Sequence, residues 1–89
     1  MRTNFERYLI NNGYKTVTPN DRPSTVYDYI KRVDSVCRWE QLTWEGLAGN
    51  IPMIISMYDM GGAKQHLGEK SHRAVINALR RFSEFLNTY

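Results

Sequence analysis

The feature that most restricts the fold is an amphipathic stretch from Ser71 to Leu86, near the end of the chain. Its apolar side chains recur at intervals of three and four residues, which is the spacing of one face of an α-helix. Ser71 stands where a helix N-cap is expected. The stretch therefore predicts an amphipathic helix that begins at Ser71. Its core stripe consists of Val75, Leu79, Phe82 and Leu86, with Ala78 and Phe85 next to them.

Three further segments have helical spacing. The first runs from Thr3 to Asn12, with Thr3 and Glu6 placed as a capping box and Gly13 as the stop. The second runs from Ser24, its cap, to about Trp39. The third follows Asn50, with Pro52 in its first turn.

The connections between these segments contain glycine, proline and cap residues. Thr43 is placed to cap one extra short helical turn, with Trp39 and Trp44 expected to wedge between helices. The stretch from Asp59 to Lys70 contains three glycines and predicts a flexible turn. No segment alternates convincingly with a period of two. The pattern predicts an all-α domain of four main helices with a possible extra turn.

Length and composition indicate one small domain. The chain has 89 residues, 42% of them hydrophobic, which predicts a single compact domain over residues 1–89. The net charge of +3 permits a nucleic-acid partner without requiring one. The single cysteine, Cys37, favours a reducing compartment, and its helix position predicts a buried thiol. Without a signal-peptide pattern or a long apolar run, we expect a cytoplasmic protein and no membrane contact.

Groups that could support catalysis are sparse. His66 and His72 lack the cysteine or carboxylate neighbours of a zinc site. The glycines and lysine between Met60 and Gly68 lack the order of a phosphate-binding loop. Cys37 has no evident histidine partner, which argues against a nucleophile. We therefore expect no enzyme activity, no metal site and no cofactor.

Three sequence patterns occur in an order that resembles a known domain. The first is F-x-x-Y-L followed by a glycine, at Phe5, Tyr8, Leu9 and Gly13. The second is Thr25 with Tyr29 four residues later, and the third is the run Ala78, Leu79, Arg80, Arg81, Phe82 with Phe85. Together they resemble the core-binding, SAM-like domain at the N-terminal side of tyrosine recombinases and phage integrases. The resemblance implies a compact orthogonal bundle of four main helices. The catalytic domain is absent, so we expect a domain that stands alone and cannot cut DNA.

The resemblance also implies a non-catalytic domain that binds double-stranded DNA. In that family the second and last helices approach the major groove, and their basic side chains contact phosphates. Arginine and lysine release counterions from phosphate, asparagine can pair with adenine, and amides at a helix start favour a phosphate. Carried over by position, the DNA-binding residues are Thr25, Lys31, Arg32, Lys70, Ser71, His72, Arg73, Asn77 and Arg80.

Protein binding is the alternative function. A small helical domain from a mobile element could serve as an accessory factor, inhibit a host defence nuclease, or associate with itself. Exposed methionine side chains suit adaptable protein interfaces. The apolar residues expected on that surface are Met53, Met57, Met60 and Ile76.

Overall fold

Four longer helices and two short ones make up the part of the chain that the computed structural model describes, residues 1–14 and 25–88. Those residues form no strand, so the all-α prediction is confirmed. The Cα radius of gyration is 12.6 Å, close to the value of about 12 Å expected for a compact domain of this length. The helices are α1 (Arg2–Asn11), α2 (Thr25–Glu40), α3 (Trp44–Gly49), α4 (Ile51–Tyr58), α5 (Gln65–Gly68) and α6 (Lys70–Thr88).

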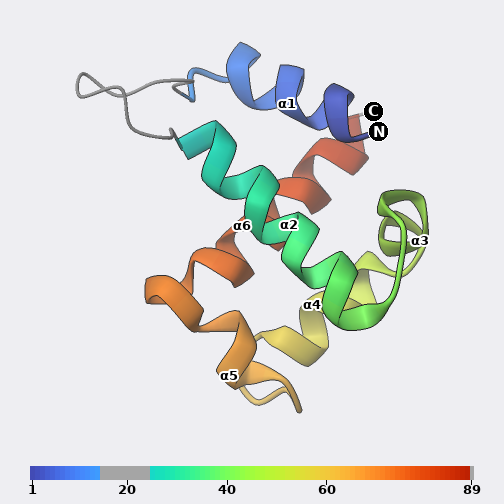
Figure 1. Ribbon diagram of the computed structural model, residues 1–89, viewed down its shortest axis with the longest axis vertical. Coiled ribbons are helices and arrows are strands. Elements are labelled where there is room, and N and C mark those ends of the chain that lie inside the picture. Colours follow the sequence, from blue (N-terminus) through green and yellow to red (C-terminus); the bar gives the residue numbers. More distant parts are fainter. Residues whose placement is uncertain (15–24, 89) are drawn as a thin grey trace.

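The packing centres on α2 and α6. Figure 1 shows α6 crossing behind α2, with α1 above and α4 and α5 below, and with both chain ends on the same side. The core contains an aromatic group in which the Phe5 and Phe82 rings are 5.3 Å apart and Trp44 lies 5.3 Å from Phe82. Because Phe5 comes from α1, Trp44 from α3 and Phe82 from α6, this group holds three helices together.

Two helix ends match the sequence prediction. Gly13 has a φ of +89°, and Tyr14 donates its backbone N–H to the Leu9 carbonyl at 3.1 Å, the pattern of a Schellman stop. At the start of α3 the Thr43 hydroxyl accepts a hydrogen bond from the Gly46 amide at 3.0 Å. The extra turn predicted near Thr43 is therefore confirmed as α3.

Two predicted caps are wrong. α1 begins at Arg2 with Met1 as its N-cap residue, so Thr3 lies inside the helix and its capping box does not form. Ser71 has φ 56° and ψ 50°, whereas an N-cap residue adopts an extended backbone. His72 and Arg73 share this left-handed conformation, so the right-handed part of α6 follows them. The cap predicted at Ser24 lies outside the described residues.

The connection between α4 and α6 is more ordered than the flexible turn that its glycines predict. It contains the short helix α5 and packs tightly on the end of α4. A Cβ at the buried Gly68 would lie 1.9 Å from the Tyr58 carbonyl oxygen. Glycine is therefore required here by close approach of two backbones as well as by turn formation.

The two tryptophans have different positions. Trp44 lies half-buried in the aromatic group, as predicted. Trp39 is 36% exposed and stacks on the Tyr58 ring with centroids 6.4 Å apart, so it covers one end of the core without being enclosed. Cys37 is buried, as predicted, and burial with the nearby charges of Asp34 and Glu45 raises its thiol pKa to about 11. No described helix combines the length and apolarity that crossing a bilayer requires.

Candidate nucleic-acid interface

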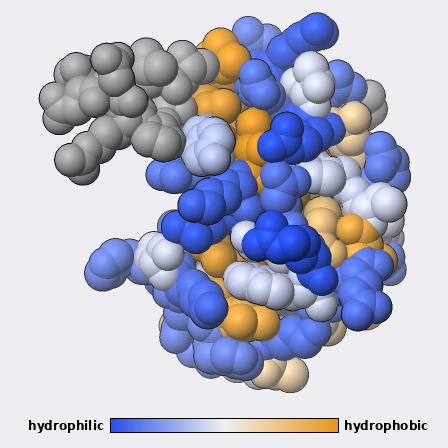
Figure 2. Space-filling view, viewed as in Figure 1, coloured by the Kyte–Doolittle hydropathy of each residue, from blue (hydrophilic) through white to orange (hydrophobic). Residues whose placement is uncertain are grey.

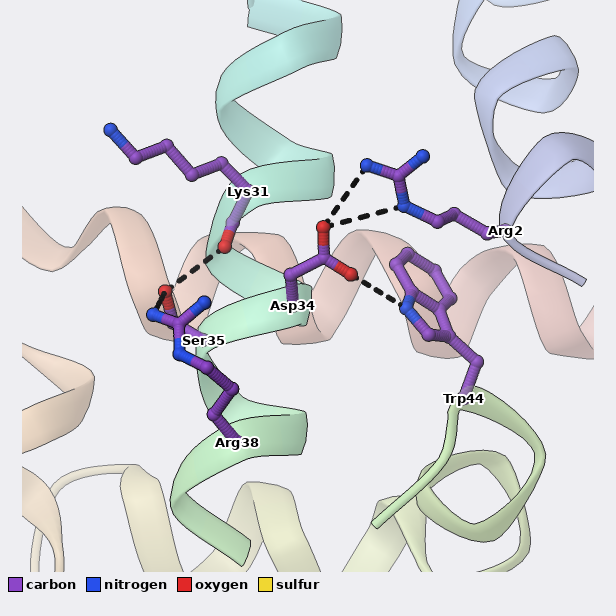
Figure 3. Close-up of polar contacts among 6 residues, drawn as sticks. All are labelled: Arg2, Lys31, Asp34, Ser35, Arg38 and Trp44. Carbon is purple, nitrogen blue, oxygen red and sulfur yellow. Dashed lines mark hydrogen bonds and ion pairs between the residues drawn. The ribbon is translucent and has the colours of Figure 1, made fainter. Parts of the chain in front are cut away.

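Figure 3 shows the polar contacts that the middle of α2 makes with its neighbours. Asp34 accepts hydrogen bonds from Arg2 of α1 at 3.1 Å and from the Trp44 indole of α3 at 2.8 Å. These contacts fasten three helices together. Lys31 and Arg38 project away from Asp34 in this view, although they share one face of the helix with it, three and four residues away. The Lys31 and Arg38 side chains are both exposed.

The basic face of α2 consists of Lys31, Arg32 and Arg38. Lys31 and Arg38 are seven residues apart, which puts them on the same side of the helix and about 10.5 Å apart along its axis. Arg38 is held by a 3.2 Å hydrogen bond to the Ser35 hydroxyl, which itself donates to the Lys31 carbonyl at 3.0 Å. No carboxylate within residues 1–14 and 25–88 forms an ion pair with the three cations of this face.

Lys70, at the start of α6, extends this face. Its ammonium lies 5.5 Å from the centre of the Trp39 ring, a cation–π contact, and it forms no ion pair with an acid in the described part of the chain. Trp39 follows Arg32 by seven residues and so lies on the same side of α2. Lys31 with Arg38, and Arg32 with Lys70, therefore lie along the exposed part of α2, where the exposed Asp28 stands three residues before Lys31 and four before Arg32.

Arg32 is the least exposed member of the face. Its residue is half-buried, and its Nε atom is shielded from solvent without a hydrogen-bond partner among the described residues. A buried donor without a partner costs free energy, and an atom that is shielded from solvent is equally out of reach of an external phosphate.

The two predicted arginines of α6 lie elsewhere. Arg73 and Arg80 both approach Asp59 at the end of α4, with Nη2–carboxylate distances of 3.9 Å and 2.6 Å. Their charges are partly neutralised by this single carboxylate. The structure thus brings Arg73 and Arg80 together, but as partners of an acid and not as part of the basic face of α2.

The remaining predicted site residues are exposed and scattered. Thr25 begins α2, about 9 Å along its axis from Lys31. Ser71 and His72 belong to the left-handed turn, so the helix start that was expected to offer amides to a phosphate at Ser71 is not formed there. Asn77 lies on the exposed side of α6, three residues before Arg80.

Two residues that shape the distribution of charge, Arg38 on α2 and Asp59 beside Arg73 and Arg80, were not among the predicted ones. Arg38 could have been found, because its spacing from Lys31 is visible in the sequence. Asp59 could not, since 14 residues separate it from Arg73 and nothing in the local pattern pairs them. Figure 2 shows hydrophilic residues over much of this view.

Groups suited to metal binding do not gather in the part of the chain that the structure describes, where no three His, Cys, Asp or Glu side chains come together. His66 and His72 are both exposed. Comparison of the chain with models of known protein families, with curated proteins and with solved structures finds no match.

Proposed function

We propose that the protein is a non-catalytic domain that binds double-stranded DNA, chiefly through the basic face of α2 with Lys70. One observation carries the proposal: none of these four cations forms an ion pair with a described carboxylate. Unpaired lysine and arginine side chains release counterions when they neutralise phosphates. The resemblance to the SAM-like core-binding domain, with its orthogonal helix arrangement and its DNA-binding second helix, supports the same reading.

The spacing of the cations suits a duplex. Lys31 and Arg38 lie about 10.5 Å apart along α2, which is comparable to the roughly 12 Å width of the DNA major groove. Four phosphate contacts predict that the logarithm of the binding constant falls with the logarithm of salt concentration with a slope of about −4. Thr25 and Asn77 are secondary candidates at the two ends of this surface.

The proposal is tested by measuring the anisotropy of a labelled duplex over a range of salt concentrations. Lys31→Gln and Arg38→Gln are each expected to weaken binding about tenfold at 50 mM salt and to reduce the slope by about 0.9. Arg7→Gln is the matched control, because Arg7 is an exposed arginine of α1 that forms no ion pair with a described residue. Circular dichroism verifies the fold of each variant.

The same measurements test both DNA binding itself and its location on α2. If wild type does not bind at 20 mM salt, or if Lys31→Gln and Arg38→Gln bind as Arg7→Gln does, the proposed interface on α2 is wrong. Loss of binding in all three variants indicates a response to net charge alone and also contradicts the proposal.

A second candidate function is protein binding or self-association through methionine side chains. Met53 is 55% exposed and Met60 is 73% exposed, values that suit a contact surface. The set named from the sequence needs correction, because Ile76 is 1% exposed and belongs to the core, and Met57 is half-buried. Light scattering of wild type and of Met53→Lys/Met60→Lys tests this candidate, since a self-associating surface predicts a lower mass for the variant.

A further inference from the structure

Asp59 lies where it engages two arginines of α6 at once. Its Oδ2 atom is 2.6 Å from Arg80 Nη2 and its Oδ1 atom is 3.9 Å from Arg73 Nη2. The backbone N–H of Met60 donates to Oδ1 at 2.7 Å, which fixes the orientation of the carboxylate. The carboxylate of Asp59, the residue that follows α4, thus lies between two guanidinium groups.

This cluster is open to solvent. The side chains of Arg73 and Arg80 are 44% and 45% exposed, and that of Asp59 is 29% exposed. Guanidinium groups bind carboxylate and phosphate oxygens with similar geometry. A pair of arginines that holds a carboxylate in this way has the chemistry to hold a phosphate.

We propose that Arg73 and Arg80 form a second site for a DNA backbone phosphate, and that the Asp59 carboxylate occupies it and thereby limits DNA affinity. This inference rests on the proposed function and adds to it a residue, Asp59, that opposes binding. The competing ligand is a phosphodiester of the same duplex that contacts the basic face of α2.

The Asp59 carboxylate and a DNA phosphate compete for the same two arginines. The carboxylate is always adjacent, and hydrogen bonds from Arg80 and from the Met60 amide hold the pKa of Asp59 below its usual range, so that it stays ionised at neutral pH. Ion pairs between exposed groups are nevertheless weak, because water and salt screen them. Neutralising Asp59 should therefore be sufficient to make both arginines available to phosphate.

The experiment uses Asp59→Asn in the full chain. Asparagine retains an oxygen that can accept from the Met60 amide but removes the negative charge. We expect duplex binding to tighten about tenfold or more at 50 mM salt, and the salt slope to steepen by about 0.9 to 1.8, as one or two further phosphates are neutralised. Glu6→Gln is the matched control, since it removes an exposed carboxylate of α1 that forms no ion pair with a described residue.

A second set of variants assigns the gain to the two arginines. Arg73→Gln/Arg80→Gln is expected to change the salt slope little in the wild type, because Asp59 already engages both groups. In the Asp59→Asn protein the same pair should abolish the gain. If Asp59→Asn behaves as Glu6→Gln does, or if its gain survives the loss of both arginines, the inference is wrong.

Failure of this inference is distinguishable from failure of the proposed function. Wild-type binding that depends on Lys31 and Arg38 but does not respond to Asp59→Asn overturns only the second site. A gain in Asp59→Asn that depends on Arg73 and Arg80 supports the second site, even if the α2 variants bind as wild type does. An Asp59→Asn protein that does not bind duplex at low salt overturns the second site.

Discussion

The phenol of Tyr58 donates a 2.7 Å hydrogen bond to a carboxylate oxygen of Glu40, and so joins the last residue of α4 to the last residue of α2. Lys64 donates to the same oxygen and pairs with it. The Trp39 ring lies over Tyr58 on one side, and Lys70 lies over Trp39. This arrangement fixes the end of α2 where Lys70 extends its basic face.

The Tyr58–Glu40 hydrogen bond should contribute measurably to stability. Tyr58→Phe keeps the fully buried ring and removes only the hydroxyl, so we expect urea unfolding to show a loss of about 1.5–3 kcal/mol, as is typical of a hydrogen bond to a charged group. Tyr8→Phe is the control, because the Tyr8 hydroxyl has no hydrogen-bond partner among the described residues. In a double-mutant cycle with Glu40→Gln, a coupling energy below about 0.3 kcal/mol would show that the two groups act independently.

The free energy of unfolding should decrease at acidic pH because the Glu40 carboxylate becomes protonated. Burial alone raises the pKa of its carboxyl, but hydrogen bonds from Lys64 and Tyr58 outweigh burial and lower that pKa below its usual value of about 4.3. Because the folded-state pKa is the lower one, the stabilisation is complete above about pH 4.3 and is lost as the pH falls through the folded-state pKa. Unfolding free energies measured from pH 6 to pH 2 should fall less steeply for Glu40→Gln than for wild type.

The control for the acid experiment is Glu6→Gln, which removes an exposed carboxylate of α1 without an ion pair in the described part of the chain. Its pH profile should follow that of wild type. Equal profiles for wild type and Glu40→Gln would contradict the role assigned to Glu40.

The left-handed turn at the start of α6 predicts a stabilising glycine substitution. His72 is exposed and has φ 58° and ψ 47°, a conformation that costs roughly 1–2 kcal/mol in a non-glycine residue. Glycine adopts this conformation without that cost, but it also raises the conformational entropy of the unfolded chain, which offsets part of the gain. We therefore expect His72→Gly to stabilise the folded protein by about 0.5–1 kcal/mol. Thermal unfolding should then show a midpoint higher by a few degrees.

The matched substitution is Asn77→Gly, within the right-handed part of α6, where glycine is expected to destabilise by a few tenths of a kcal/mol. The two variants should therefore shift the unfolding midpoint in opposite directions. A decrease for both would mean that residue 72 is right-handed helical in solution.

Local sequence patterns predicted most of the helical framework. The three- and four-residue spacing from Val75 to Phe85 is sufficient to define the buried face of α6, and all but one side chain of that predicted stripe are buried, Leu86 being half-buried. Gly13 and Thr43 set a helix end and a helix start through bonds to residues within five positions. Such signals are short-range, so they can be recognised without knowledge of the rest of the fold.

The distribution of charge was decided by tertiary structure. The sequence places Arg73 and Arg80 on the outside of a helix, but only the packing of α4 against α6 brings Asp59 between them, across a separation of 21 residues in the case of Arg80. Packing likewise places Lys70 over Trp39 and imposes the left-handed turn that replaces the predicted cap at Ser71. Periodicity shows which side of a helix faces water, whereas the partner that a charge meets depends on distances between helices, and those are set by the packed core.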